Sequence, residues 1–523
     1  MNRLLNYMFV ILLAVIFTNC TGDFDEMNTD PNNVTEVEPG LLLPKMQYAV
    51  INANAYEYQR GENLFANLYC QWISNSISYF NSDRYEFNNG WATDAYWKPY
   101  YTFVLKNLLD IKHMSEKYPE YQEMYQIARI VAAVGAARTT DLFGDVPYSE
   151  ASRGLDKPKF DAQKDIYEDI LNELKEATEA LRTGFNVEQK KYGSQDLFYN
   201  GAVDKWIKLG NSLRLRYALR ISFIEPDKAK QEGESALSAA TMDNTGDNAY
   251  LITAITDDGH PMFVISNWNE FRMSSTFEDA YKTLSTVVDP RMLFYWGYTV
   301  GSVDNGAPEV KGIRNGLPTD QLPSPDVSSS CWGLLWGPSW NSSRVTPSTF
   351  TIEAPLYVMC YSELCLLKAE AAIRGWSNAG SAQTNYENGI RASFDEARLD
   401  VDPSLYSTAN DNTYITTGSV LWNDGAEFET KLEKIATQKW IALFPNGTEG
   451  WAEVRRTGYP KLQPVARSDA PAINVANGEF IKKLRYVDIE LEANKENARS
   501  ESLNGGKGDG LNVRVWWDTG RYK

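Results

Sequence analysis

Hydrophobic residues recur every three to four positions along most of the chain, which is the period of amphipathic α-helices. The helices that this pattern predicts span residues 41–58, 64–80, 92–117, 121–142, 162–181, 203–224, 227–240, 276–287, 356–374, 382–397 and 427–444. Strand-like alternation is sparse, with 353–359 and 513–517 as the best short candidates. The pattern therefore predicts a mostly α-helical fold with long irregular loops and a few short strands.

Helix pairs in the first half of the chain suggest a helical-repeat scaffold. Trp206–Gly210 has the Trp, two residues, Leu, Gly order that opens a tetratricopeptide repeat, but Leu213 stands where that repeat has Tyr. No 34-residue period is apparent. We therefore predict a degenerate tetratricopeptide-like scaffold rather than a regular solenoid.

The N-terminus has the features of an export signal. Arg3 is the one positive charge, Tyr7–Phe17 is an apolar run too short to span a bilayer, and Cys20 follows at the place of a lipidated cysteine. Ordinary secretion with an incidental cysteine is the alternative. We predict a lipoprotein signal peptide over 1–19, and Cys20 as the lipidation site.

The rest of the chain divides by composition. Residues 20–40 are acidic and rich in turn residues, which predicts a flexible tether. Residues 41–523 are expected to form a single domain. Within it, 41–240 is the helical-repeat scaffold, 241–355 a loop-rich ligand or partner region, and 356–523 the C-terminal helices and loops. Long loops inside a domain are usually functional.

The composition argues against several classes of function. Lys and Arg number 51 against 69 Asp and Glu, the net charge is −18 and no basic run is present, so nucleic-acid binding is not indicated. With two histidines, His-based metal catalysis has few candidate ligands. The cysteines after Cys20 have no metal-site spacing and are expected to be free thiols. We expect no metal, no cofactor and no catalytic residue.

Five phrases in this order resemble the SusD/RagB family of nutrient-binding outer-membrane lipoproteins. They are Thr139–Ala151 (TTDLFGDVPYSEA), Trp206–Ser222, Gln438–Phe444 (QKWIALF), Gly450–Pro460 (GWAEVRRTGYP) and Arg514–Asp518 (RVWWD). The resemblance covers nearly the whole chain. It implies a SusD-like helical fold and a lipid-anchored protein of the outer membrane, facing the cell surface, in a Bacteroidetes-type bacterium. The arginines of these phrases are expected to pair with carboxylates between helices.

The same resemblance implies a binding function. Such proteins capture oligosaccharides for uptake through a SusC-like TonB-dependent transporter, which would be the partner of this chain. An oligopeptide-binding member of the family is the alternative, and a surface glycoside hydrolase is a third reading. Hydrolysis needs two suitably spaced carboxylates, but Asp165, Asp169, Glu173 and Glu176 fall on the polar face of a predicted helix, where solvation is the expected role.

Candidate ligand contacts combine aromatic and polar side chains, since sugar rings have apolar faces and hydroxyl edges. Tyr69 and Trp72, at helical spacing, are expected in the core. The candidate contacts lie in an exposed loop at 81–85, in the segment 267–272 before a helix, and in a Trp-rich loop at 331–341 that equally suits a transporter contact. They are Asn81, Asp83, Arg84, Tyr85, Trp268, Asn269, Phe271, Arg272, Trp332, Trp336 and Trp340.

The lipidation hypothesis gives a direct prediction. Cys20→Ala removes the acceptor thiol, so the variant is expected in the soluble fraction while the parent chain stays with the membranes. Mass spectrometry of the parent's N-terminal peptide checks for the lipid. A variant that remains membrane-bound, together with a parent that carries no lipid mass, contradicts the hypothesis.

Overall fold

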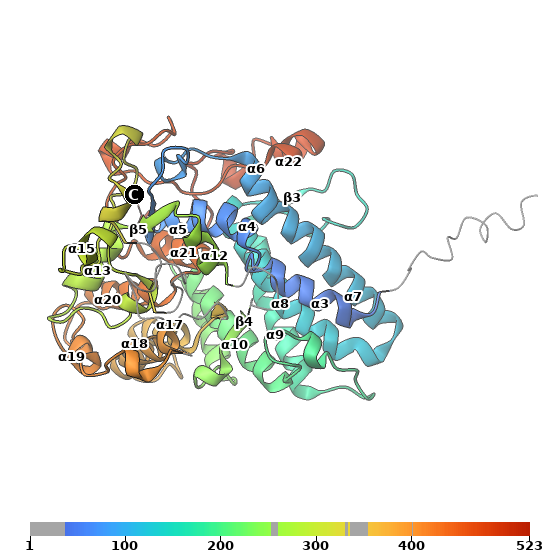
Figure 1. Cartoon of the computed structure of the whole chain (residues 1–523). Coiled ribbons are helices and arrows are strands. Elements are labelled where there is room, and N and C mark those ends of the chain that lie inside the picture. Colours follow the sequence, from blue (N-terminus) through green and yellow to red (C-terminus); the bar gives the residue numbers. More distant parts are fainter. Residues whose placement is uncertain (1–36, 253–259, 330–332, 335–353, 400, 523) are drawn as a thin grey trace, which may run out of the picture. The chain divides into compact units, whose positions relative to one another are not determined.

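Long helices that follow one another along the first half of the chain also pack on one another in space (Figure 1). The computed structural model describes residues 37–252, 260–329, 333–334, 354–399 and 401–522. The helices of this half that form the scaffold are α3 (Pro39–Ala49), α7 (Lys106–Lys117), α8 (Gln122–Phe143), α9 (Gln163–Thr183), α10 (Val203–Arg220) and α11 (Pro226–Leu237). Each helix from α7 to α11 contacts the next, which is the arrangement of a helical-repeat scaffold.

The predicted helix 92–117 is part of a longer helical stretch. It runs through α6 (Asn89–Ala92), two π-helical segments, η3 (Thr93–Trp97) and η4 (Tyr100–Leu105), and α7. The stretch packs on α3 and α8. One helical stretch therefore joins Trp91, in α6, to the helical scaffold.

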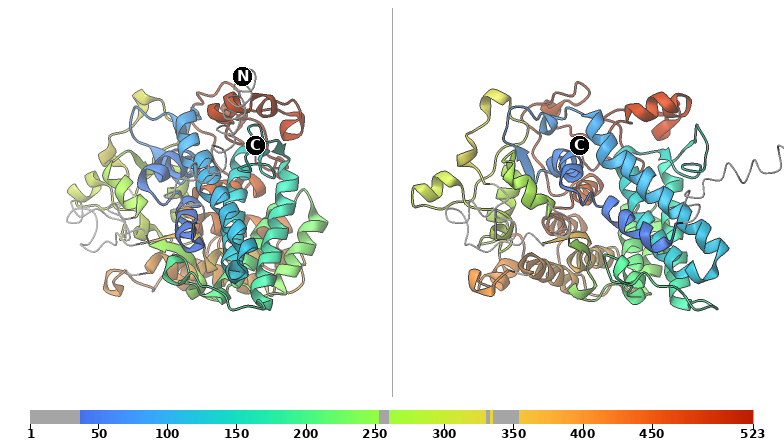
Figure 2. Two further views of the ribbon diagram at one scale, coloured as in Figure 1. Left: turned by 90° about the vertical axis from the view of Figure 1, so that its right-hand side faces the viewer. Right: turned by 45° about the vertical axis from the view of Figure 1, so that its right-hand side comes forward.

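A second group of helices covers the C-terminal half. α17 (Tyr361–Ile373) packs on α18 (Ala382–Arg398) and α20 (Phe428–Ala442), and α20 packs on α21 (Gly447–Thr457). α10 contacts α17, so the two groups share an interface, and views from two further directions show the helices of both groups (Figure 2). The prediction of a mostly helical fold is confirmed.

The strands form two-stranded antiparallel sheets. In the described part of the chain, β1 (Ile73–Asn75) pairs with β5 (Phe271–Met273), β2 (Val146–Pro147) with β3 (Phe160–Asp161), and β4 (Ala249–Ile252) with β6 (Pro355–Met359). Shorter helices lie between these elements. Those used below are α4 (Ala55–Tyr58), α5 (Asn67–Tyr69) and α12 (Pro261–Asn267).

Several predicted elements are corrected by the structure. The predicted helix 41–58 breaks after Ala49, and the predicted helix 64–80 ends at Tyr69 and is followed by β1. Asn52 and Gln71 have φ values of 52° and 58°, a left-handed conformation that interrupts a right-handed helix. The start of the predicted helix 356–374 is β6, and 513–517 is irregular rather than a strand.

Gly144 ends α8 with φ of 82°, as the Gly-Asp-Val-Pro phrase suggests. A Cβ atom at this position would lie 2.1 Å from Oδ1 of Asn504. That oxygen also accepts a hydrogen bond from the Asp145 amide at 3.1 Å. A glycine is therefore required both by the backbone conformation and by the close approach of the C-terminal segment.

Buried ion pairs join α10 to the helices of the C-terminal half. Arg216 binds Glu363 on α17, and Arg220 binds Glu449 on α21 at 2.5 Å. Burial alone would raise the pKa of Glu449, but Arg220 and Arg216 outweigh burial and lower it to about 2. The expected pairing of the family arginines with carboxylates is confirmed for these two residues.

The pairing continues around Arg456 of α21. Its guanidinium binds Glu370 on α17 at 2.6 Å and Glu453 on its own helix at 2.8 Å, while Lys439 of α20 binds Glu453 at 2.9 Å. Arg455 differs from the expectation, because it donates to the backbone carbonyls of Asp141 and Lys482 rather than to a carboxylate.

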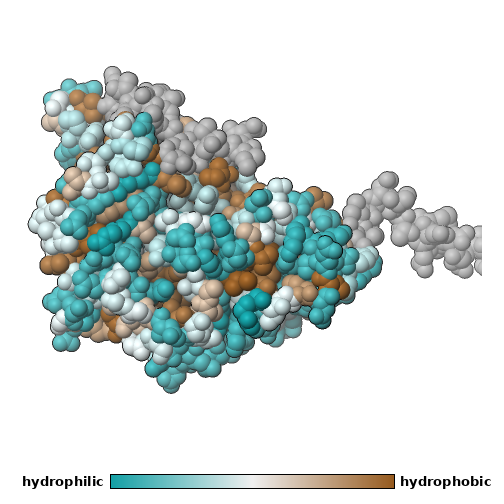
Figure 3. Space-filling model, turned by 90° about the horizontal axis from the view of Figure 1, so that it is seen from below, coloured by the Kyte–Doolittle hydropathy of each residue, from teal (hydrophilic) through white to brown (hydrophobic). Residues whose placement is uncertain are grey.

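In the described part of the chain, no helix has the length and apolar character needed to cross a membrane. Hydrophobic residues on the lower face are interspersed with hydrophilic ones (Figure 3).

We predict that Arg456→Met lowers the free energy of unfolding by about 1–3 kcal/mol, because it removes the guanidinium shared by Glu370 and Glu453 and leaves these buried carboxylates with one cation each, Arg374 and Lys439. Denaturant unfolding followed by circular dichroism measures this loss. The matched control is Arg182→Met on α9, whose pair with Glu179 is exposed and therefore contributes little. Equal, small effects of the two substitutions would contradict a structural role for the buried network.

Candidate functional site

Aromatic side chains gather around one carboxylate where α4, α12, β1 and β5 meet. We call this group the Glu270 aromatic surface, and its members are Tyr56, Tyr79, Phe80, Trp91, Trp268 and Glu270. They come from three separate parts of the sequence. Pairing of β1 with β5 brings the residues after Asn75 next to those before Phe271.

Local structure fixes the first pair of rings. The Asn54 side chain accepts hydrogen bonds from the amides of Tyr56 and Glu57, which caps α4 and sets the position of Tyr56. α12 packs on α4 and ends at Trp268, whose ring centroid lies 5.3 Å from that of Tyr56. Tyr56 is 56% exposed, so one of the two rings is largely available to a ligand.

Glu270 is the carboxylate of the surface. Its carboxylate accepts a hydrogen bond from the Tyr79 hydroxyl at 2.9 Å and another from the side-chain amide of Gln59. Burial raises the pKa of Glu270, and the two hydrogen bonds act in the opposite direction. The Tyr79 side chain is 64% exposed, and its hydrogen bond to Glu270 fixes the position of the ring.

The second group of rings continues from Tyr79 toward the core. Phe80 contacts Tyr79 edge-on with centroids 4.8 Å apart, and Trp91 contacts Phe80 at 5.4 Å. Trp91 in turn packs on buried Phe65. The exposed ring is therefore supported by a series of contacts that ends in the interior.

This arrangement can bind a ligand that has both apolar faces and hydroxyl groups. Exposed tyrosine rings cover apolar faces, and the carboxylate of Glu270 can accept hydrogen bonds from hydroxyls. Within the described part of the chain, no group of three or more His, Cys, Asp or Glu side chains could hold a metal ion.

Of the sequence-predicted contacts, the structure places two at this surface. Trp268 is half-buried in contact with Tyr56, and Asn269 is exposed with φ of 61° at the turn into β5. Asn81 is half-buried and donates from Nδ2 to Glu86 at 2.7 Å. Trp332, Trp336 and Trp340 lie outside the described residues.

The expected exposure of the 81–85 loop is wrong for four of its five residues: Ser82, Asp83, Arg84 and Tyr85 are 1%, 2%, 6% and 1% exposed. The Asp83 carboxylate accepts hydrogen bonds from the amides of Asn75 and Gly316. Burial raises its pKa to about 6 despite these bonds. Asp83 therefore connects β1 to the 316 region from inside the protein.

The neighbours of Asp83 are similarly engaged. Arg84 donates from Nε to Asp469 at 2.7 Å, and the Tyr85 ring packs on Tyr69 at 5.8 Å. Tyr69 itself is buried, as expected for a core residue. The sequence pattern does not predict this burial, because Gly316, which bonds to Asp83, and Asp469, which binds Arg84, are 233 and 385 residues away along the chain.

Phe271 and Arg272 are also interior, each 2% exposed, since they lie in β5. Arg272 donates from Nη2 to Oδ1 of Asn269 at 2.6 Å and from Nε to the Pro325 carbonyl at 3.2 Å. It thereby holds the turn that carries Trp268 and Glu270. Arg272 therefore supports this turn from the interior and is not exposed to a ligand.

Sequence reasoning missed Tyr56, Trp91 and Glu270 as possible contacts. Tyr79 and Phe80 fall at the end of the predicted helix 64–80, whereas the structure places them in the turn that follows β1. The one usable signal was the Asn-Trp-Asn-Glu-Phe-Arg phrase, which contains Glu270. Nothing local indicated that Tyr56 and Trp91 would join it.

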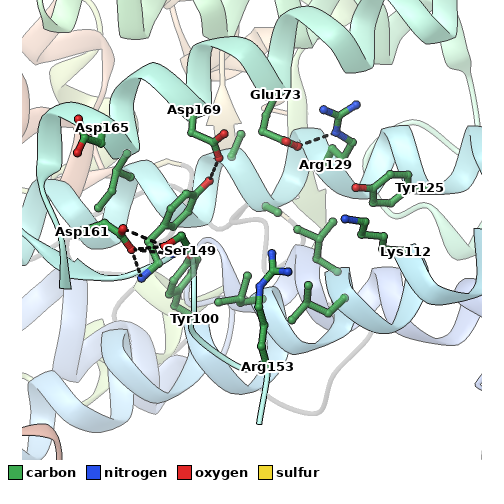
Figure 4. Close-up of a pocket in the computed structure, with 17 residues that line it drawn as sticks. Tyr100, Lys112, Tyr125, Arg129, Ser149, Arg153, Asp161, Asp165, Asp169 and Glu173 are labelled. Atoms are coloured by element: carbon green, nitrogen blue, oxygen red, sulfur yellow. Dashed lines mark hydrogen bonds and ion pairs between the residues drawn. The ribbon is translucent and has the colours of Figure 1, made fainter. Parts of the chain in front are cut away.

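A second concave site lies in the helical scaffold. It is a cavity of about 350 Å³ lined by α7, α8, α9 and the segment between β2 and β3 (Figure 4). Asp165, Asp169 and Glu173 lie on its wall. The expected role of these three carboxylates, plain solvation on a helix face, is therefore incomplete.

The comparison with known proteins agrees with the helical fold described above. The family described as Susd and RagB outer membrane lipoprotein matches residues 23–518. No curated protein matches the chain.

Solved structures similar to this chain include a chitin-binding SusD homologue from Flavobacterium johnsoniae, with 26% identity, a TM-score of 0.74, and coverage of 92% of this chain and 99% of that one. Another, named only as a chitin-binding protein, has 28% identity, a TM-score of 0.76, and coverage of 92% and 100%. A SusD homologue from Bacteroides uniformis has 27% identity, a TM-score of 0.75, and coverage of 92% and 99%.

Proposed function

The chain belongs to the SusD-like family of outer-membrane lipoproteins, and from that premise we propose that it captures oligosaccharides at the Glu270 aromatic surface without cleaving them. The observation that carries the proposal is a pair of exposed rings at one carboxylate-bearing turn: Tyr79 is hydrogen-bonded to Glu270, and Tyr56 packs on Trp268, two residues before Glu270. Two similar structures are described as chitin-binding. We therefore take oligomers of N-acetylglucosamine as the first ligand class to test.

The chemistry of capture is simple. Each pyranose ring has an apolar face that a tyrosine or tryptophan ring can cover, and the hydroxyls at its edge can donate to Glu270. Tyr56 and Trp268 would hold one part of the oligomer, and Tyr79 another. Binding of this kind needs no proton transfer, so the small number of histidines is no obstacle.

Two further parts of the proposal follow from family membership. The chain is anchored through Cys20 at the cell surface, and it passes its ligand to a SusC-like TonB-dependent transporter. Cross-linking in intact membranes of the native host, followed by mass spectrometry, tests the partnership. Recovery of a TonB-dependent transporter supports it, and recovery of the chain without any such transporter contradicts it.

We predict that Tyr79→Ala and Tyr56→Ala each weaken binding of an N-acetylglucosamine hexasaccharide about tenfold, since each removes one stacking face. Isothermal titration calorimetry on residues 21–523 measures the change. Both side chains are mostly exposed, so the melting temperature is expected to stay near that of the parent chain.

The matched control is Tyr118→Ala, which removes a half-buried aromatic ring at the end of α7, away from this surface. Unchanged affinity in both tyrosine variants would rule out this surface as the sugar site. Tight binding of peptides with no binding of any oligosaccharide would favour the oligopeptide alternative.

A further inference from the structure

The cavity of the helical scaffold has a charge distribution that the proposed sugar site does not explain. We call it the α7–α9 pocket. Its volume of about 350 Å³ is at the small end of the ~300–1,000 Å³ range of ligand sites. Leu105, Leu108, Ala132 and Ile166 supply part of its wall, so the pocket has an apolar surface between its charged groups.

Most of the charges are separated by sign. Figure 4 shows Asp161, Asp165 and Asp169 toward one end of the pocket and Lys112 and Arg129 toward the other, where Glu173 binds Arg129, with Arg153 between the two ends. A neutral ligand would leave these separated charges without partners. They suit a molecule that carries a positive group at one end and a negative group at the other.

At the acidic end, two carboxylates have no cation bound to them. Asp165 forms no hydrogen bond or ion pair with any described residue, and Asp169 accepts one bond, from the Tyr148 hydroxyl at 2.6 Å. Burial raises the pKa of Asp169 and Glu173 acts in the same direction, while the Tyr148 hydrogen bond and the charge of Arg129 offset only part of this effect. A bound ammonium group would relieve this unfavourable environment.

At the basic end, the cations differ in how fully they are paired. Arg129 is neutralised by Glu173 and Glu176, at 2.6 and 2.7 Å. Lys112 lies 3.8 Å from Glu116, a loose and exposed contact. Arg153, between the two ends, has no hydrogen-bond or ion-pair partner in the described part of the chain. Arg153 and Lys112 are therefore available to a carboxylate ligand.

Tyr100 offers a polar contact inside the pocket. Its side chain lines the pocket and is 4% exposed, and its hydroxyl forms no hydrogen bond with any described residue. The hydroxyl oxygen is accessible from the pocket, because it is not among the buried atoms that lack a partner. It is therefore available to bond to water or to a ligand.

We propose that the α7–α9 pocket binds a small zwitterion of about dipeptide size. Asp165 and Asp169 hold its ammonium group, Arg153 and Lys112 hold its carboxylate, and the Tyr100 hydroxyl bonds to its polar middle. The site is separate from the Glu270 aromatic surface. Trp91 and Tyr100, the pocket residue nearest to it along the same helical stretch, lie nine residues or about 13 Å apart. The proposal does not depend on sugar binding.

The test is calorimetric titration of residues 21–523 with the dipeptide Ala-Leu and two capped forms of it. Acetylation of the N-terminus removes the ammonium group, and amidation of the C-terminus removes the carboxylate. We expect the free dipeptide to bind and each cap to weaken binding at least tenfold. Absence of binding by the free dipeptide at millimolar concentration, or equal binding by the capped forms, overturns the proposal.

Variants locate the binding. Arg153→Gln and Asp165→Asn change exposed residues and are each expected to weaken Ala-Leu binding about tenfold, while Tyr100→Phe removes only the unpartnered hydroxyl and gives a smaller loss. The matched controls are Lys157→Gln in the same loop and Glu168→Gln on the same helix, neither of which lines the pocket. Equal losses in variants and controls would show a general charge effect and overturn the assignment.

Discussion

Pairing of buried arginines with carboxylates is the constraint on which the rest of this structure depends. Arg216, Arg220 and Arg456 are almost fully buried, and each has a carboxylate from another helix within 2.5–2.8 Å. A buried charge without a partner is strongly destabilising, so these helices can pack only in the arrangement that satisfies every pair. In particular, the network fixes α21 against α10 and α17.

The position of α21 affects the proposed sugar site, because α21 packs closely against Trp72. Gly450 of α21 lies against Trp72 so closely that a Cβ atom there would be 2.3 Å from the indole ring. Trp72 directly precedes β1, and β1 pairs with β5, which follows Glu270. The scaffold thus sets the backbone that presents Tyr79 and Trp268, and contacts with Glu270 and Tyr56 fix the positions of these two rings.

The sequence predicted the regular parts of the fold and missed the parts that depend on distant contacts. α8, α9, α18 and α20 match their predicted spans closely, because hydrophobic residues recur at helical spacing along each of them. The 64–80 region failed because a left-handed residue and a strand pairing interrupt a helical pattern. Asp83 was expected in solvent for a similar reason: its partners, Asn75 and Gly316, are brought together only by the tertiary fold.

The central claim is capture of intact oligosaccharides, and native mass spectrometry of residues 21–523 tests it most directly. The protein is mixed with N-acetylglucosamine oligomers and with tryptic peptides, and the supernatant is examined for cleavage. The account predicts complexes with intact oligomers and no shortened products. Complexes with peptides alone, or shortened sugars in the supernatant, would contradict it.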